Sequence, residues 1–139
     1  MATMTAKSAQ YSPVDVADFV ASRELTRLRL LAGEKLFLKG DEANSTMFVV
    51  IDGRIDVLLL GRVLDSIGPG GVVGEMALID CTHRSAAALA QTDCELVAID
   101  RPTFLGLAAE QPELALAIIS IMSQRLARVA EIIRNAAEA

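Results

Sequence analysis

The sequence predicts a mainly β fold with flanking helices, and two observations support this fold class. Between residues 26 and 100, short runs rich in Val, Ile, Leu and Phe are separated by turn signals centred on glycine. Several short strands at this spacing indicate an all-β roll or barrel. From residue 113 to residue 136 the sequence has no Gly or Pro and consists largely of helix-compatible residues, which predicts a long C-terminal helix.

The chain of 139 residues has the size of one domain. Apolar residues make up 53% of it and charged residues 22%, which is the composition of a globular chain rather than a disordered one. The small and polar residues 1–12 are expected to form a flexible tail. We therefore expect a single domain over residues 13–139, with the β-roll at about 26–100 and C-terminal helices at about 101–136.

The remaining elements follow from local signals in chain order. Residues 13–25 are expected to form a short amphipathic helix, with Asp15 and Asp18 near its N-terminus, where the helix dipole favours them. Asp52-Gly53 between two apolar runs predicts a hairpin turn, because both positions tolerate positive φ. Pro102 suits the first turn of a short helix that begins at Arg101. Further turn signals lie at Ala32-Gly33, Lys39-Gly40-Asp41, Gly61 and Gly68-Pro69-Gly70-Gly71.

The apolar residues of the final helix form two neighbouring stripes, which Arg125 and Arg128 interrupt. The first stripe holds Ala115, Ile118, Met122, Leu126, Val129 and Ile133, and the second holds Leu114, Ile118, Ile121 and Ile132. One stripe is enough to pack this helix against the β-roll. The extra width leaves two interpretations open: a second surface for a protein partner or another copy of the chain, or a single broad side that faces the core.

The charge and hydropathy of the chain exclude some classes of partner. A net charge of −5 argues against non-specific binding to nucleic acid, which needs a basic surface. It does not argue against one small anion, because a single arginine in a dry pocket can bind it. No apolar run approaches the roughly 18–20 residues that span a bilayer, and the N-terminus lacks a signal-peptide core. We therefore expect no nucleic-acid or membrane partner and a cytoplasmic location.

The chemistry-bearing residue types argue against an enzyme. Cys81 and Cys94 are the only cysteines, and they are expected to be reduced thiols rather than a disulfide framework. His83 is the only histidine, and the cysteines lack the spacing of metal ligands. Because no nucleophile–base pair and no metal cluster can be placed, we predict a protein without catalytic activity, metal or cofactor.

The richest motif begins at Gly74-Glu75 and ends at Arg84-Ser85-Ala86. A glycine-led turn opens a short helix whose N-terminus suits an anion. Arg84 offers a planar fork of donors that matches a phosphate, and Glu75 suits a sugar hydroxyl. Together these residues describe a pocket for a ribose-phosphate ligand.

The segment GEMALIDCTHRSA at 74–86 resembles the phosphate-binding cassette of the cyclic nucleotide-binding domain family, found in catabolite activators, protein kinase A regulatory subunits and cyclic nucleotide-gated channels. Other segments also resemble the family: residues 31–41 and 47–60 as its first and central hairpins, and residues 64–78 as the approach to the cassette. The resemblance covers roughly residues 25–135. It implies a double-stranded β-helix, a jelly-roll-like β-roll, with an N-terminal helix, a short cassette helix and two C-terminal helices.

By this resemblance, Arg84 pairs with the cyclic phosphate and Glu75 accepts a hydrogen bond from the ribose 2′-hydroxyl. The backbone N–H groups of Met76 and Ala77 are expected to face the phosphate. The other cassette positions in the predicted site are Val73, Gly74, Ser85 and Ala86. Two alternatives stay open: a structural salt bridge of Arg84 with Glu75 or Asp80, and a Glu75 carboxylate placed only by the helix dipole.

The purine end of the site departs from the family pattern. In the catabolite activators a Thr-Ser pair of the last helix contacts adenine, whereas Val129-Ala130 stands at the corresponding place here. Arg125, one turn earlier, is the better candidate to contact the base, its alternative being a solvated helix arginine. Thr after the cassette arginine accompanies cGMP preference in the family, so Ser85 favours cAMP as the ligand. His83 either adds a pH-sensitive donor near the phosphate or is an exposed loop histidine.

The resemblance implies a binding module that senses cAMP, or less favourably cGMP, without hydrolysing it. Ligand binding would move the short helix at 74–79 and the segment near 101–112, and so reposition the final helix. Since the helix-turn-helix of the transcription factors is absent from these 139 residues, we expect a stand-alone regulatory module read by a protein partner or by dimerisation. The alternative is a degenerate fold that serves as a protein-interaction scaffold without nucleotide.

Overall fold

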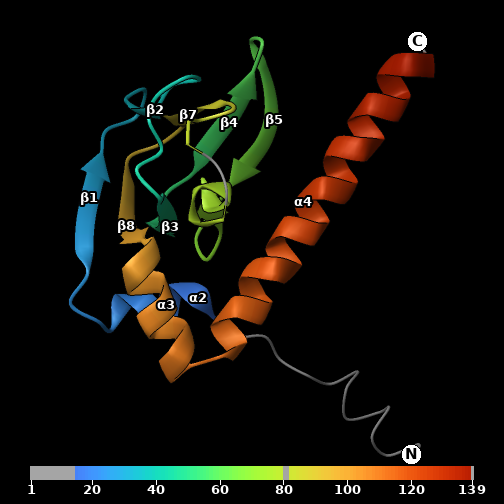
Figure 1. Cartoon of the computed structure of the whole chain (residues 1–139). Coiled ribbons are helices and arrows are strands. Elements are labelled where there is room, and N and C mark those ends of the chain that lie inside the picture. The colour runs from blue at the N-terminus through green and yellow to red at the C-terminus, as the bar shows by residue number, and fades with distance from the viewer. Residues whose placement is uncertain (1–14, 80–81, 139) are drawn as a thin grey trace, which may run out of the picture.

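The computed structural model describes residues 15–79 and 82–138, and the predicted tail over residues 1–12 lies outside these ranges. A roll of strands stands beside one long helix, with two shorter helices at the base of the roll (Figure 1). The elements are α2 (Val16–Ala21), β1 (Thr26–Leu30), β2 (Lys35–Phe37), β3 (Thr46–Asp52), β4 (Ile55–Leu59), β5 (Arg62–Ile67), β6 (Val72–Val73), the 3-10 helix η1 (Glu75–Leu78), β7 (Ala87–Ala90), β8 (Cys94–Asp100), α3 (Arg101–Glu110) and α4 (Glu113–Glu138).

The strands form two four-stranded antiparallel sheets, in the orders β1-β8-β3-β6 and β2-β7-β4-β5. Strands that are neighbours in the chain mostly lie in different sheets, so the chain passes repeatedly from one sheet to the other. The mainly β fold class with flanking helices is therefore confirmed.

Two predicted hairpins are wrong. Residues 31–41 were expected to form one and Asp52-Gly53 to close another, but β1 and β2 belong to different sheets, and so do β3 and β4. Gly53 has φ +87°, and a Cβ on it would lie 2.2 Å from the carbonyl oxygen of Asp93. The glycine thus serves a crossing between sheets where two backbone segments approach closely, and such a crossing needs the same positive φ as a hairpin turn.

The tight hairpin of the structure joins β4 to β5 instead. Leu59 pairs with Arg62 across a two-residue loop, in which Leu60 has φ 52° and Gly61 has φ 76°. Positive φ at both positions is the geometry of a type I′ turn, whose twist matches that of the flanking strands. Gly61 was noted as a turn signal in the sequence, but the partner strand was not predicted.

Two cores lie on opposite faces of the β1-β8-β3-β6 sheet, because side chains along a strand alternate between faces. In β3, Met47 and Val49 pack toward the helices, whereas Val50 faces the interior of the roll. The outer core contains buried residues from α2, α3 and α4. The helices therefore cover one sheet and leave the other sheet to shape the space next to the cassette.

The helices begin near where the sequence predicts, and the N-terminal helix is shorter than predicted. Helix α2 spans Val16–Ala21 within the predicted range 13–25, and the Asp15 carboxylate caps it by accepting from the Asp18 amide at 3.1 Å. Helix α3 begins at Arg101 with proline in its first turn. Within the described residues, no single helix has both the length and the apolar character to cross a bilayer; α3 and α4 meet that criterion only when taken together across a 120° bend.

The buried side chains of the long helix α4 lie only in its first turns. Its buried side chains are those of Leu114, Ala117 and Ile118, while Leu126 is 71% exposed and Ile133 is 63% exposed. The interpretation of the two apolar stripes as a single broad core-facing side is therefore wrong, because the stripes are divided along the length of the helix. Figure 1 shows the C-terminal part of α4 leaving the roll.

The cap of α3 provides a test of stability against pH. Hydrogen bonds from the Thr103 side chain and backbone lower the pKa of the Asp100 carboxyl, and the backbone bond to Oδ1 is 2.9 Å long. The stabilisation is present above the ordinary pKa and is lost as the pH falls through the lowered pKa. We expect Asp100→Asn, which keeps a capping oxygen but no charge, to lower Tm by a few degrees at neutral pH.

That difference in Tm is expected to shrink as the pH falls below the ordinary carboxyl pKa, and to vanish once the pH lies below the lowered pKa of Asp100, where the native carboxyl is protonated as well. Thermal unfolding followed by circular dichroism at a series of pH values measures it. A Tm difference of constant size down to low pH would contradict a contribution from the charge of Asp100.

Candidate functional site

The cassette begins where β6 ends, at a glycine that the geometry requires. Gly74 has φ +74°, and a Cβ on it would lie 2.4 Å from Nη1 of Arg84. The 3-10 helix Glu75–Leu78 follows at once, as the predicted short helix. The Ala77 amide donates to the Gly74 carbonyl at 3.2 Å, which closes the turn. The role of the Ala77 amide as a phosphate donor stays a prediction.

Arg84 is buried beside this turn and is held by backbone carbonyls. Arg84 is only 7% exposed. Nη2 donates to the carbonyl oxygens of Ala43 at 3.1 Å and Thr46 at 2.7 Å, and Nη1 donates to that of Gly74 at 3.3 Å. A guanidinium fixed in this way needs little reordering to meet an anion, which lowers the cost of binding.

Two aromatic rings support the same guanidinium, and the sequence did not point to either. The Arg84 Cζ atom lies 4.3 Å from the ring centroid of Phe37 and 5.6 Å from that of Phe48. These are cation–π distances. Phe37 and Phe48 come from β2 and β3, far from the cassette in the sequence, so only the paired sheets bring them to Arg84.

Glu75 is tied to the long helix rather than to Arg84. Its carboxylate accepts from Nη1 of Arg125 at 2.5 Å, and its side chain is 6% exposed. Arg125 also pairs with Asp65 through Nε at 3.3 Å and donates to the Val72 carbonyl at 2.8 Å. The interpretation of Arg125 as a solvated helix arginine is therefore wrong, and so is the alternative of a structural salt bridge between Arg84 and Glu75.

One cavity of about 210 Å³ collects all of the predicted site residues. The predicted set on its lining is Val73, Gly74, Glu75, Met76, Ala77, Arg84, Ser85, Ala86 and Arg125. Phe37, Val57, Leu64 and Val129 complete the lining and were not predicted, apart from Val129 as a position without a polar group. The charged residues of the lining are Arg84, Arg125 and Glu75, while Val57, Leu64 and Val129 give the cavity an apolar wall. Whether these residues bind a nucleotide stays a prediction.

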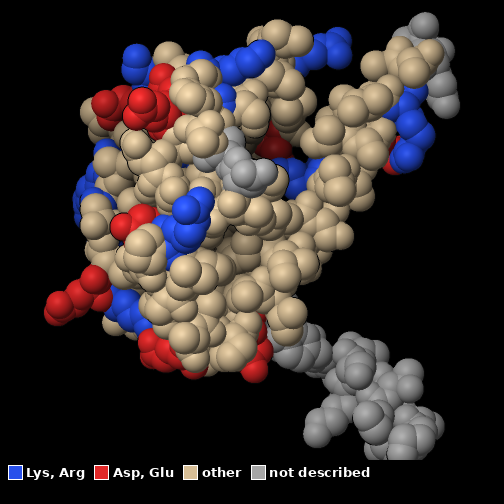
Figure 2. All heavy atoms as spheres, in the orientation of Figure 1, with Lys and Arg blue, Asp and Glu red and all other residues tan. Residues whose placement is uncertain are grey.

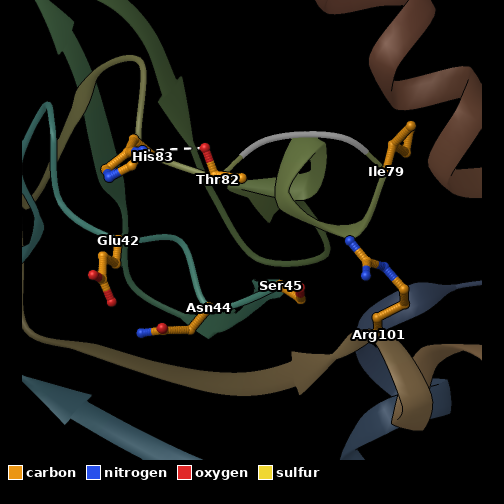
Figure 3. A pocket seen from close by; sticks show the side chains of 7 residues that line it. All are labelled: Glu42, Asn44, Ser45, Ile79, Thr82, His83 and Arg101. Carbon is orange, nitrogen blue, oxygen red and sulfur yellow. Dashed lines mark hydrogen bonds between the residues drawn. The ribbon is translucent and has the colours of Figure 1, made fainter.

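His83 lies in a different hollow. It is exposed, and its Nδ1 lies 3.1 Å from the Thr82 hydroxyl oxygen. The hollow measures about 550 Å³, and Figure 3 shows His83, Glu42 and Asn44 around it, with Arg101 on the side of α3. The cavity of the cassette does not include His83 in its lining, so the interpretation as an exposed loop histidine is supported over a donor near the phosphate. Asp80 and Cys81, which precede it, lie outside the described residues.

In the described part of the chain, no group of three or more His, Cys, Asp or Glu side chains is arranged to hold a metal ion. Cys94 is a free and buried cysteine of the inner core. The polar groups of the cassette cavity are suited to contacts with an anion and a hydroxyl group.

Comparisons with known proteins bear on this cavity. A family model described as "Cyclic nucleotide-binding domain" matches residues 27–111. Over 99 residues, the chain is 34% identical to the cyclic AMP receptor protein of Thermus thermophilus, an alignment of 68% of this chain and 45% of that protein. Over 72 residues, it is 39% identical to a cAMP-dependent protein kinase regulatory subunit of Eremothecium gossypii, an alignment of 52% of this chain and 16% of that subunit. The chain thus spans less than half the length of these two relatives.

The fold agrees with the sequence comparison. The crystal structure of the Thermus thermophilus catabolite activator protein matches with a TM-score of 0.71 and 29% identity, covering 93% of this chain and 61% of that one. The family match extends over more than half of the chain and includes the whole cassette. The chain belongs to the cyclic nucleotide-binding domain family.

Proposed function

We propose that this chain binds a cyclic nucleotide in the cassette cavity, prefers cAMP to cGMP, and passes the signal on by moving α4. The observation that carries the proposal is the meeting of Arg84, Glu75 and an apolar wall in one cavity. Domains of this family are regulatory sensors rather than enzymes. We accordingly assign the chain a regulatory role and no catalytic one.

Each part of the cavity suits one part of the ligand. The cyclic phosphate carries one negative charge, which the guanidinium of Arg84 neutralises with charge-assisted hydrogen bonds. The ribose 2′-hydroxyl donates to Glu75. The purine lies against Val57, Leu64 and Val129, where burial of its apolar faces is favourable.

The apolar wall also supports the preference for adenine. Guanine carries a carbonyl and an amino group on its edge where adenine carries a single amino group, and burying polar groups without partners costs free energy. Ser85, in the place where threonine accompanies cGMP preference in the family, supports the same choice. The Thermus thermophilus relative is by its name a receptor for cyclic AMP.

The proposed signal path runs through Glu75. The same carboxylate that receives the ribose hydroxyl already holds Arg125 of α4. A nucleotide that changes the position of Glu75 therefore acts on α4 directly. The relay requires that the nucleotide bind the protein more tightly when α4 is in one position than when it is in another.

The exposed apolar residues of α4 suit a protein partner or a second copy of the chain as the reader of this movement. Large side chains with more than a third of their surface exposed are Leu116, Ile119, Leu126, Ile132 and Ile133. Apolar surface of this kind, gathered on one element, is typical of interaction sites.

Isothermal titration calorimetry of the full chain with cAMP and then cGMP tests the proposed function. We expect micromolar or tighter binding of cAMP and weaker binding of cGMP. At a ligand concentration of 100 times the dissociation constant, the folded state should gain about 2.7 kcal/mol, which a thermal shift detects. No heat with either nucleotide, together with an unchanged Tm, would instead favour a protein-interaction scaffold.

A further inference from the structure

Two arginines of α4 form ion pairs with one carboxylate of the roll. This carboxylate lies outside the cassette segment 74–86. Asp65 lies on β5, and its side chain is 10% exposed. Its Oδ2 pairs with Arg125 Nε at 3.3 Å, and its Oδ1 pairs with Arg128 Nη1. In Figure 2, acidic and basic atoms come together in the groove between α4 and the roll.

Polar contacts, including these ion pairs, join the roll to the second half of α4, where no side chain is buried. Among residues 123–137 none is buried, and all but Arg125, Val129 and Ala130 are exposed. The apolar contacts of α4 lie earlier, at Leu114, Ala117 and Ile118. The position of Arg125 above the cavity is therefore set by its polar partners rather than by packing of the helix.

Asp65 and Glu75 share Arg125 between them. Arg125 uses Nε for Asp65 and Nη1 for Glu75, so the two carboxylates hold the guanidinium from two sides. The planar guanidinium has a fixed donor geometry, and restraining one edge of it directs the other edge. The orientation of the Glu75 carboxylate, which is also buried, thus depends on Asp65 indirectly, through Arg125.

We propose that Asp65 is a positioning residue of the nucleotide site: it fixes Arg125, and through Arg125 it orients Glu75 toward the ribose 2′-hydroxyl. The inference rests on the proposed function, since it assigns a role in binding the same ligand. It also makes a separate statement about the protein without ligand, that Asp65 holds the second half of α4 against the roll.

Asp65→Asn tests the first statement, because it keeps the shape of the side chain and removes its charge. Loss of a charge-assisted hydrogen bond is expected to weaken cAMP binding about tenfold in calorimetry. The 2′-deoxy analogue of cAMP should lose less affinity than cAMP, so the preference for the ribose hydroxyl shrinks. Arg125→Met should reduce this preference to the same extent, and the double variant should lose little more than Arg125→Met alone.

A simple effect of charge predicts the opposite sign. Removing the negative charge of Asp65 would raise the affinity for an anionic ligand, with or without Arg125. A gain in cAMP affinity, or an unchanged ratio between cAMP and its 2′-deoxy analogue, would overturn the positioning role. Glu131→Gln is the matched control, because it breaks an exposed ion pair with Arg134 on the same helix and is expected to leave both affinities unchanged.

Hydrogen exchange without nucleotide tests the second statement. In Asp65→Asn, the amides of residues 123–136 should exchange faster than in the native chain, whereas Glu131→Gln should not change those nearest the roll. Equal exchange in Asp65→Asn and the native chain would overturn the anchoring of α4. If the native chain binds no cyclic nucleotide, the proposed function fails, and this exchange experiment still decides whether Asp65 holds the helix.

Discussion

Replacing Arg84 with alanine is expected to weaken cAMP binding by at least about a hundredfold, or roughly 2.7 kcal/mol. In the proposed complex, the guanidinium supplies the positive charge that faces the cyclic phosphate, and a charge-assisted hydrogen bond contributes about 1.5–3 kcal/mol. Its removal also leaves the phosphate charge uncompensated in a partly buried cavity. Calorimetry of the native chain and the variant with cAMP measures the difference.

The contacts of Arg84 demand a control for folding. The guanidinium also bonds the carbonyl oxygens of Ala43, Thr46 and Gly74, so the alanine variant loses stability as well as affinity. Arg84→Lys retains the charge without the planar fork and separates the two effects. We expect it to keep more of the native Tm and still bind cAMP clearly more weakly. A loss below about threefold in a folded Arg84→Ala protein would exclude Arg84 as the phosphate ligand.

The second large effect is expected at Gly53, on stability rather than binding. A Cβ in Gly53→Ala would lie 2.2 Å from the backbone oxygen of Asp93 and 2.8 Å from Sγ of Cys94, at φ +87°. The left-handed conformation alone costs a non-glycine residue about 1–2 kcal/mol. Because the nearest atom belongs to the backbone, the crossing between the sheets must also shift, and we expect a total loss of about 3 kcal/mol or more.

Gly33→Ala separates conformation from contact. Gly33 has φ +91°, and no neighbouring atom lies within 4 Å of the place that an alanine methyl group would take. Its substitution should therefore cost only the conformational term of about 1–2 kcal/mol. Urea unfolding of both variants and the native chain gives the two free energies. Equal losses at the two glycines would show that the crossing at Gly53 adapts to a side chain.

The cassette could be predicted from the sequence because its groups are carried by one continuous segment. Gly74, Glu75 and Arg84 lie close together in the chain, and their residue types alone indicate a tight turn, a hydroxyl acceptor and a phosphate donor. Phe37 and Leu64 line the same cavity, yet each looks in the sequence like an ordinary strand residue. Their place depends on which strands pair, and pairing between distant strands leaves no local signal.

The errors in the sequence prediction have the same origin. Asp52-Gly53 satisfies the conformational demand of a hairpin, but a crossing between two sheets makes the same demand. The apolar stripes correctly predicted that residues 113–138 form an amphipathic helix. They could not predict where along this helix the packing stops, because that depends on how far the roll extends beside it. Asp65 was likewise an unremarked strand residue until the fold placed it opposite Arg125 and Arg128.

Under the proposed relay, the way α4 is attached would make it a lever. Its packed end lies at residues 114–118, and about 20 residues extend beyond that pivot, or about 30 Å of helix. A tilt of about 10° at the pivot would move the far end by about 5 Å, close to the length of one helical turn. In the proposed relay, a small displacement at the cassette cavity would thus become a larger displacement at the far end of α4.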